Sequence, residues 1–137
     1  MSDVVTPRTT VLPLSNGRSI TVHAELNHGQ HMAYLARVYR ESADGTLSRD
    51  MLKTGDAMVM AYLVDWTLTD SSGQRIDIQG LPQDELQDVF NNLRIPVALE
   101  VKRAVQAHDA AIDAAADALK KTDSTDASSA MTLQSVG

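Results

Sequence analysis

The 137-residue chain contains no cysteine. This absence excludes disulfide bonds and thiolate zinc sites, and it fits a protein that stays in a reducing cytoplasm. Aromatic side chains are also scarce, with one tryptophan, one phenylalanine and three tyrosines. They occupy positions compatible with a core and form no array on which nucleic-acid bases would stack.

Positive charge is in the minority, with 12 lysines and arginines against 18 acidic residues and a net charge of -6. Such a charge repels phosphate backbones, so we expect no nucleic-acid binding. The longest apolar run, Ala57 to Val64, is far shorter than the ~20 residues that span a bilayer. The N-terminal sequence MSDVVTPRTT lacks the apolar core of a signal peptide. We therefore expect a soluble protein that does not enter membranes.

Motifs for catalysis are missing as well: there is no phosphate-binding glycine pattern, nucleophile elbow or kinase signature. We therefore expect no enzymatic activity, no catalytic residues and no cofactor. His23, His28 and His31 could meet as metal ligands in principle, but no HExxH or Cys/His pattern accompanies them. We predict no metal site, and we expect His28 and His31 to be solvated residues at a helix start.

Asp65 follows the longest apolar run directly and precedes the only tryptophan. Apolar surroundings would raise the pKa of its carboxyl group and suit it to general acid catalysis. Alternatively, it accepts backbone N–H groups where a helix passes into a strand. Because no motif places a second acid, base or nucleophile beside it, the structural interpretation is favoured.

The N-terminal part of the sequence predicts a flexible arm followed by a β-hairpin. Residues 1–8 show no periodicity, whereas apolar and polar residues alternate from position 19 to 26. Asn16-Gly17 suits a two-residue type I′ turn, so we expect a hairpin over about Thr9–Glu25. Pro13 lacks a backbone N–H group, which places the first strand at a sheet edge.

The middle of the sequence predicts two helices and a second short hairpin. Asn27 and Gln30 have the spacing of a capping box, which starts a helix that runs to about residue 40. Alanine, methionine and leucine dominate residues 57–64, which favours a core helix extending from about residue 50 and passing into a strand at Asp65. Alternation from Trp66 and the turn at residues 72–73 predict the hairpin.

The C-terminal part predicts two further helices and a tail. Pro82 suits the first position of a helix with one apolar face. Pro96 introduces a last helix, predicted from Val97 to about Lys121, which would be about 37 Å long. Residues 122–137 are rich in Ser, Thr, Asp and Ala, which predicts a disordered tail. The fold class is thus α+β and mainly α, with residues 9–121 as a single globular domain.

The last helix carries a weak heptad pattern, in which small residues and a histidine share the a and d positions. These positions are Ala98, Val101, Val105, His108, Ile112, Ala115 and Leu119. A helix of this length is too long to lie wholly against its own core. We therefore expect packing within the domain through about Val105, and a surface for a partner helix or a second copy beyond it. The candidate partner-binding residues are Val105, His108, Ile112, Ala115 and Leu119.

His108 has two interpretations on that face. It either lies at the rim of a packed face or acts as a pH-sensitive, register-setting residue in a partner interface. The rim interpretation is favoured.

The stretch AYLVDWTLTD (residues 61–70), followed by the turn SSGQ and by RIDI, resembles a conserved run of one protein family. A capped helix precedes this stretch, and an acidic helix and then an alanine-rich helix follow it. In this order the elements are similar to those of the small tail assembly chaperones of long-tailed (siphovirus-type) bacteriophages.

The resemblance implies a non-enzymatic role in virion assembly, in the cytoplasm of the host. Chaperones of this family coat the tape-measure protein of the viral tail, keep its long helices soluble and help to recruit tail-tube subunits. The implied function is therefore protein binding, with the tape-measure and tail-tube proteins as partners. The alternative is a structural virion protein, such as a tail component or head–tail connector, that stays in the particle.

Overall fold

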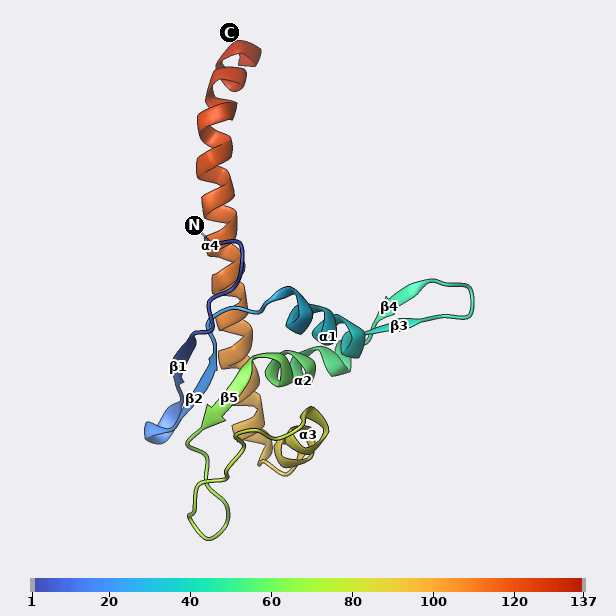
Figure 1. Ribbon diagram of the computed structural model, residues 1–137, viewed down its shortest axis with the longest axis vertical. Coiled ribbons are helices and arrows are strands. Elements are labelled where there is room, and N and C mark those ends of the chain that lie inside the picture. Colours follow the sequence, from blue (N-terminus) through green and yellow to red (C-terminus); the bar gives the residue numbers. More distant parts are fainter. Residues whose placement is uncertain (1, 137) are drawn as a thin grey trace. The chain divides into compact units, whose positions relative to one another are not determined.

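The computed structural model describes the backbone of residues 2–136 and the side chains of residues 2–119. Its strands and α-helices, labelled in Figure 1, are β1 (Thr9–Pro13), β2 (Ser19–His23), α1 (His28–Val38), β3 (Tyr39–Glu41), β4 (Leu47–Arg49), α2 (Met51–Tyr62), β5 (Leu63–Trp66), α3 (Gln83–Asn91) and α4 (Ile95–Val136). A 3-10 turn, η1 (Ser15–Gly17), connects β1 and β2. The expected α+β, mainly α class is confirmed. The chain forms two compact units, residues 1–106 and 107–137, which are described separately.

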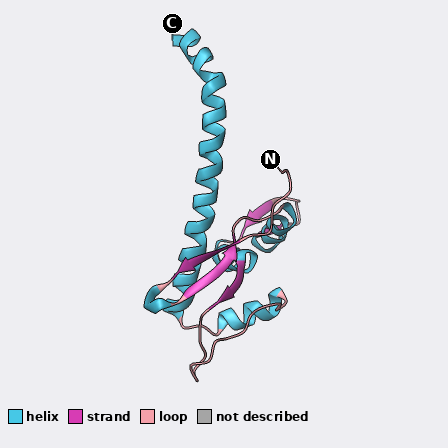
Figure 2. Cartoon of the chain, turned by 60° about the vertical axis from the view of Figure 1, so that its left-hand side comes forward, coloured by secondary structure: helices cyan, strands magenta, loops and turns pink. Residues whose placement is uncertain are grey.

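The predicted N-terminal hairpin is confirmed. Strands β1 and β2 pair antiparallel, and the sheet order β1-β2-β5 places β1 at an edge, as Pro13 predicts (Figure 2). Asn16 and Gly17 both have positive φ, and the Arg18 N–H donates to the Ser15 carbonyl at 3.2 Å. This is the type I′ geometry expected of Asn-Gly. The arm before the hairpin, residues 2–8, contains no helix or strand.

Helix α1 has the predicted capping box, in which the Asn27 side chain accepts from the Gln30 N–H and the Gln30 side chain accepts from the Asn27 N–H. The helix ends at Val38, slightly before the predicted residue 40, because the next three residues form β3. Strand β3 pairs with β4 across the turn SADGT (residues 42–46), and this hairpin is not predicted from the sequence. Every residue of this small hairpin is exposed.

The longest apolar run is divided between a helix and a strand. Helix α2 begins after Asp50, whose side chain accepts from the Leu52 N–H, and it ends at Tyr62. The prediction that the helix continues through Val64 is therefore wrong. Residues 63–66 form β5 instead and pair antiparallel with β2, so pairing in the sheet overrides the helix preference of the local sequence.

The second predicted hairpin is present in reduced form. Trp66 belongs to β5, and the only pairing beyond it within the described residues is a bridge between Thr69 and Arg75, around a turn in which Gly73 has φ 83°. Helix α3 follows, with Pro82 at its N-cap and not, as predicted, at its first helical position. Its predicted apolar face is confirmed at Leu86 and Phe90, which are both buried.

The core of residues 2–106 is formed by side chains of the sheet and the helices together. Its largest fully buried members are Trp66, Ile20, Leu68, Val22, Val38, Val59, Val101 and Val105. The indole Nε1–H of Trp66 donates to the Ile76 carbonyl at 2.9 Å, so the one polar atom of this ring has a partner.

Helix α4 continues to Val136 and not to the predicted Lys121. The residues of the predicted disordered tail, 122–137, lie beyond the described side chains.

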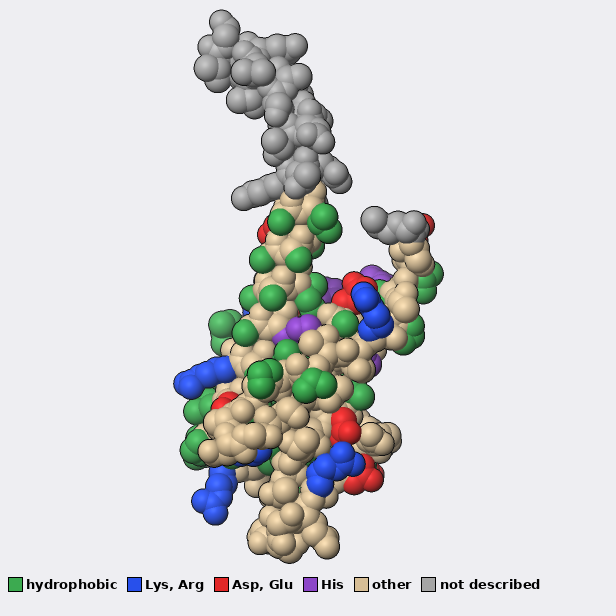
Figure 3. Space-filling model, turned by 90° about the vertical axis from the view of Figure 1, so that its left-hand side faces the viewer, with side chains coloured by type: hydrophobic (Ala, Val, Ile, Leu, Met, Phe, Trp, Pro, Cys, Tyr) green, Lys and Arg blue, Asp and Glu red, His purple; other side chains and the backbone are tan. Residues whose placement is uncertain are grey.

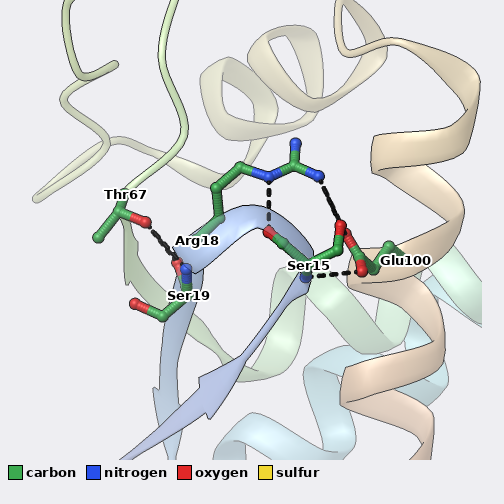
Figure 4. A network of polar contacts seen from close by, with 5 residues as sticks. All are labelled: Ser15, Arg18, Ser19, Thr67 and Glu100. Carbon is green, nitrogen blue, oxygen red and sulfur yellow. Dashed lines mark hydrogen bonds and ion pairs between the residues drawn. The ribbon is translucent and has the colours of Figure 1, made fainter.

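A polar network fastens the turn between β1 and β2 to α4 (Figure 4). Leu14 donates its N–H to the Arg18 carbonyl at 2.7 Å, which leaves the Ser15 N–H outside the ladder. The Ser15 N–H donates instead to Glu100 Oε2 at 2.9 Å, and the Ser15 hydroxyl donates to Oε1 at 3.0 Å. Arg18 forms an ion pair with Glu100 Oε1 at 3.2 Å. The hydrogen bond from the Ser15 N–H is the main reason that the pKa of Glu100 lies below its ordinary value. The positive charge of Arg18 lowers this pKa further, but less strongly.

This network predicts a specific response to acid. Because the pKa of Glu100 is lower in the folded state, the network stabilises the fold above the ordinary pKa, and this stabilisation is lost as the pH falls through the lowered value. We therefore expect Glu100→Gln to flatten the decrease in Tm between about pH 5 and pH 3. Thermal melts at several pH values measure this. Glu25→Gln, at an exposed glutamate, is the control and should keep the wild-type slope; equal slopes for all three proteins would contradict the prediction.

Candidate partner-binding surface

The five predicted partner-binding residues fall into two groups. Val105 has no exposed surface and belongs to the first unit, so the structure assigns it to the core and removes it from the candidate surface. It follows Val101 by four positions, and Val101 is equally buried. Residues four apart lie on the same helix face, so this part of the heptad pattern serves the protein's own core.

The other four residues belong to the second unit. Ala115 and Leu119 are exposed, with Leu119 at 69%, while His108 and Ile112 are half-buried. Ile112, Ala115 and Leu119 are spaced i, i+3 and i+7, which places them on one face of α4. Hydrophobic side chains recur along the described part of this helix in Figure 3. Together with His108, these three residues form the α4 face (His108, Ile112, Ala115 and Leu119).

Carboxylates recur on the side of α4 that points away from the α4 face. Asp113 and Asp117 are exposed and four positions apart, so their charges repel each other along the helix. The four residues of the α4 face itself include no carboxylate, so these aspartates are separated from the candidate surface by the body of the helix.

A second exposed apolar group surrounds the start of α2 and is not predicted by the sequence analysis. Leu47, Met51 and Leu52 are all exposed, with Leu52 at 92%. Periodicity assigns residues 51–52 to a core helix because they precede the apolar run. The first turn of α2 nevertheless lies outside the core, since Thr54 is the first buried residue of the helix.

Leu52 also lines a groove of about 520 Å³ formed by residues of α1, α2 and α3. Asp56 is its most strongly held polar group: Oδ1 lies 2.7 Å from the Lys102 ammonium, and Oδ2 accepts from Gln87 Nε2 at 3.2 Å. The same ammonium lies 6.0 Å from the centre of the Phe90 ring. These contacts occupy both carboxylate oxygens and join α2, α3 and α4.

Asp65 accepts a backbone N–H as expected, but it lies within β5 and not at the junction of helix and strand, which the structure places between Tyr62 and Leu63. Its Oδ1 accepts from the Trp66 N–H at 2.9 Å, and its Oδ2 accepts from Gln79 Nε2 at 3.0 Å. Arg75 forms an ion pair with the same Oδ2 at 3.4 Å. The carboxylate thus fastens the segment after β5 to the strand, and both of its oxygens are engaged.

The remaining chemical candidates are placed as follows. His28 and His31 are exposed at the start of α1, and the His31 ring stacks on Tyr34 with centroids 6.2 Å apart. Within the described residues, no three histidine or acidic side chains come together as possible metal ligands. None of the helices, as far as they are described, has the length and apolar character to cross a membrane.

Comparisons of the chain with protein families, characterised proteins and solved structures give no match.

Proposed function

We propose that this protein is a non-enzymatic assembly chaperone of a long-tailed bacteriophage and that it binds the tape-measure protein through the α4 face. The main support is that the apolar pattern of α4 continues beyond the core. Val101 and Val105 are buried, whereas Ala115 and Leu119 keep the same periodicity in the second unit with exposed side chains. The resemblance of residues 61–70 to tail assembly chaperones supplies the biological setting.

The composition of the α4 face suits reversible binding to a helix. Alanine at position 115 and at the neighbouring position 111 allows a partner helix to approach closely, within the usual interaxial distances of about 8–10 Å. Leu119 and Ile112 supply most of the apolar area, so the contact is small and weak. A chaperone that must release its partner during tail assembly requires such a contact. Help in recruiting tail-tube subunits, in the host cytoplasm, is part of the same proposal.

Co-expression with a phage tape-measure protein, the partner that the proposal assigns, tests the proposal. We expect a soluble complex that co-purifies. Leu119→Asp should abolish it, because an unpaired charge would be buried in the interface. Ala114→Asp is the matched control, since residue 114 is exposed on the opposite side of α4 and its substitution should leave binding intact. Binding that survives Leu119→Asp would contradict the assignment of the surface.

Mass spectrometry of purified virions separates the chaperone from a structural component. A chaperone leaves before the tail is complete, so we expect the protein to be absent from finished particles. Its stoichiometric presence there would overturn the proposal in favour of a retained tail component or head–tail connector.

A further inference from the structure

The three-stranded sheet has two outer strands, and they differ in how their edges are covered. On β5, the outward Trp66 N–H is bound by Asp65 Oδ1, and the other oxygen of that carboxylate holds Gln79 and Arg75. The segment after β5 therefore covers this edge. Strand β1, at the other edge (Figure 1), has no comparable cover among the described residues.

The register identifies the backbone groups of β1 that face outward. The Ala24 N–H donates to the Arg8 carbonyl, and the Leu14 N–H donates to the Arg18 carbonyl. Because hydrogen-bonded pairs alternate in an antiparallel ladder, Thr10 and Leu12 also face β2. The N–H and C=O groups of Thr9 and Val11, and the carbonyl of Pro13, consequently point away from the sheet. Within the described residues, no hydrogen bond uses the Thr9 or Val11 N–H.

Natural proteins protect such edges with charged residues, prolines or bulges. Strand β1 has the sequence TTVLP and carries no charge. Pro13 blocks one end only, and the Val11 side chain is 63% exposed. An edge of this kind is a template for another strand.

We infer that β1 pairs antiparallel with β1 of a second copy of this chain, around a two-fold axis at Val11. In this register the two Val11 residues exchange both of their outward backbone hydrogen bonds. Each Thr9 N–H donates to the Pro13 carbonyl of the other copy. Because proline has no N–H, the reciprocal hydrogen bond from Pro13 to the Thr9 carbonyl is the only one that this register lacks. The two sheets become one continuous sheet.

The strand is self-complementary in side chains as well as in backbone groups. The symmetric register brings the two exposed Val11 side chains into direct cross-strand contact, which is a favourable β-branched pair. The nearest charge along the chain is Arg8. In the pairing, each Arg8 lies opposite Leu14 of the other copy, so the two Arg8 residues are about 20 Å apart at ~3.4 Å per residue. That separation exceeds the screening length of about 8 Å at physiological salt.

The size of the contact sets its strength. Five residues on each side bury much less than the roughly 1,200 Å² typical of a stable interface. We therefore expect a reversible dimer that forms as the concentration rises. The pairing uses β1 and not the α4 face, so it holds or fails independently of the proposed function.

Sedimentation equilibrium over a wide concentration range tests the inference on the full chain. The wild-type protein should shift from the monomer to the dimer mass. Val11→Lys should remain a monomer, because it places two like charges opposite each other. Val4→Lys makes the same change at a residue that is 77% exposed in the N-terminal arm, and it should still dimerise. A wild-type protein that stays monomeric, or a dimer that survives Val11→Lys, would overturn the inference.

Amide hydrogen exchange of the wild-type protein, followed by NMR, is a second test that requires no substitution. The Thr9 and Val11 amides should exchange more slowly as the concentration rises. The Thr10 and Leu12 amides, already bonded to β2, should be protected at every concentration. If the exchange rates of the Thr9 and Val11 amides did not depend on concentration, the pairing of two copies would be contradicted. The edge of β1 would then be open to a strand of a different protein.

Discussion

Replacing Trp66 by alanine is expected to lower the free energy of unfolding by about 3–5 kcal/mol. The side chain is 1% exposed and is the largest in the core, so its removal leaves a cavity that the surroundings fill only in part. The substitution also removes the donor to the Ile76 carbonyl, in a hydrogen bond that is partly buried. Because a domain of this kind is stable by about 5–15 kcal/mol in total, the loss is a large fraction of its stability.

Urea unfolding followed by far-UV circular dichroism measures this effect, since the variant lacks the only tryptophan for fluorescence. Trp66→Phe keeps an aromatic ring and removes the hydrogen bond, so it should cost clearly less than Trp66→Ala. Point substitutions lower the free energy of unfolding by about 1 kcal/mol on average. If Trp66→Ala lowered it by less than that, this ring would not be central to the core.

Val105→Asp should destabilise the protein by about 3 kcal/mol or more, because it buries a charge without a partner. The same change at Leu119, two heptads later on α4, should alter the free energy of unfolding by no more than about 0.5 kcal/mol, as expected of exposed positions. Val105 is fully buried and Leu119 is 69% exposed. Thermal and urea unfolding of both variants give the comparison.

The two substitutions together test whether α4 changes its role between these positions. Equal destabilisation would mean that Leu119 also belongs to a core in solution. Tolerance of aspartate at both positions would mean that neither does. Either result would contradict the division of α4 into a core part and a binding part.

Local features of the fold could be predicted from the sequence because their signals lie within a few residues. The turn at Asn16-Gly17 depends on the positive φ that both residues accept, and the start of α1 depends on the reciprocal bonds of Asn27 and Gln30. The edge position of β1 follows from the missing N–H of Pro13. Each of these is a property of a short peptide.

Pairings between distant segments could not be predicted in the same way. Residues 63–64 have neighbours that favour a helix, yet they lie in β5 because β2 offers a ladder about 40 residues earlier in the chain. The short hairpin of β3 and β4 also escaped prediction. Its three-residue strands are exposed on both faces and therefore lack the alternation that marks a strand.

The candidate surface shows the same limit of periodicity. A heptad pattern identifies which residues share a face of α4, and it placed Ile112, Ala115 and Leu119 together correctly. It contains no information on where the core ends along the helix, so Val105 was assigned to the binding surface although it is fully buried. For the same reason, the exposure of Leu52 at the start of α2 was missed.

Hydrogen exchange of this protein, alone and in complex with the tape-measure protein, tests the central claim most directly. The account predicts new protection in residues 108–119 on binding. It also predicts unchanged exchange in residues 98–105, where burial in the free protein already protects the backbone of α4. New protection confined to other segments, or none at all in 108–119, would contradict the assignment of the α4 face as the binding surface.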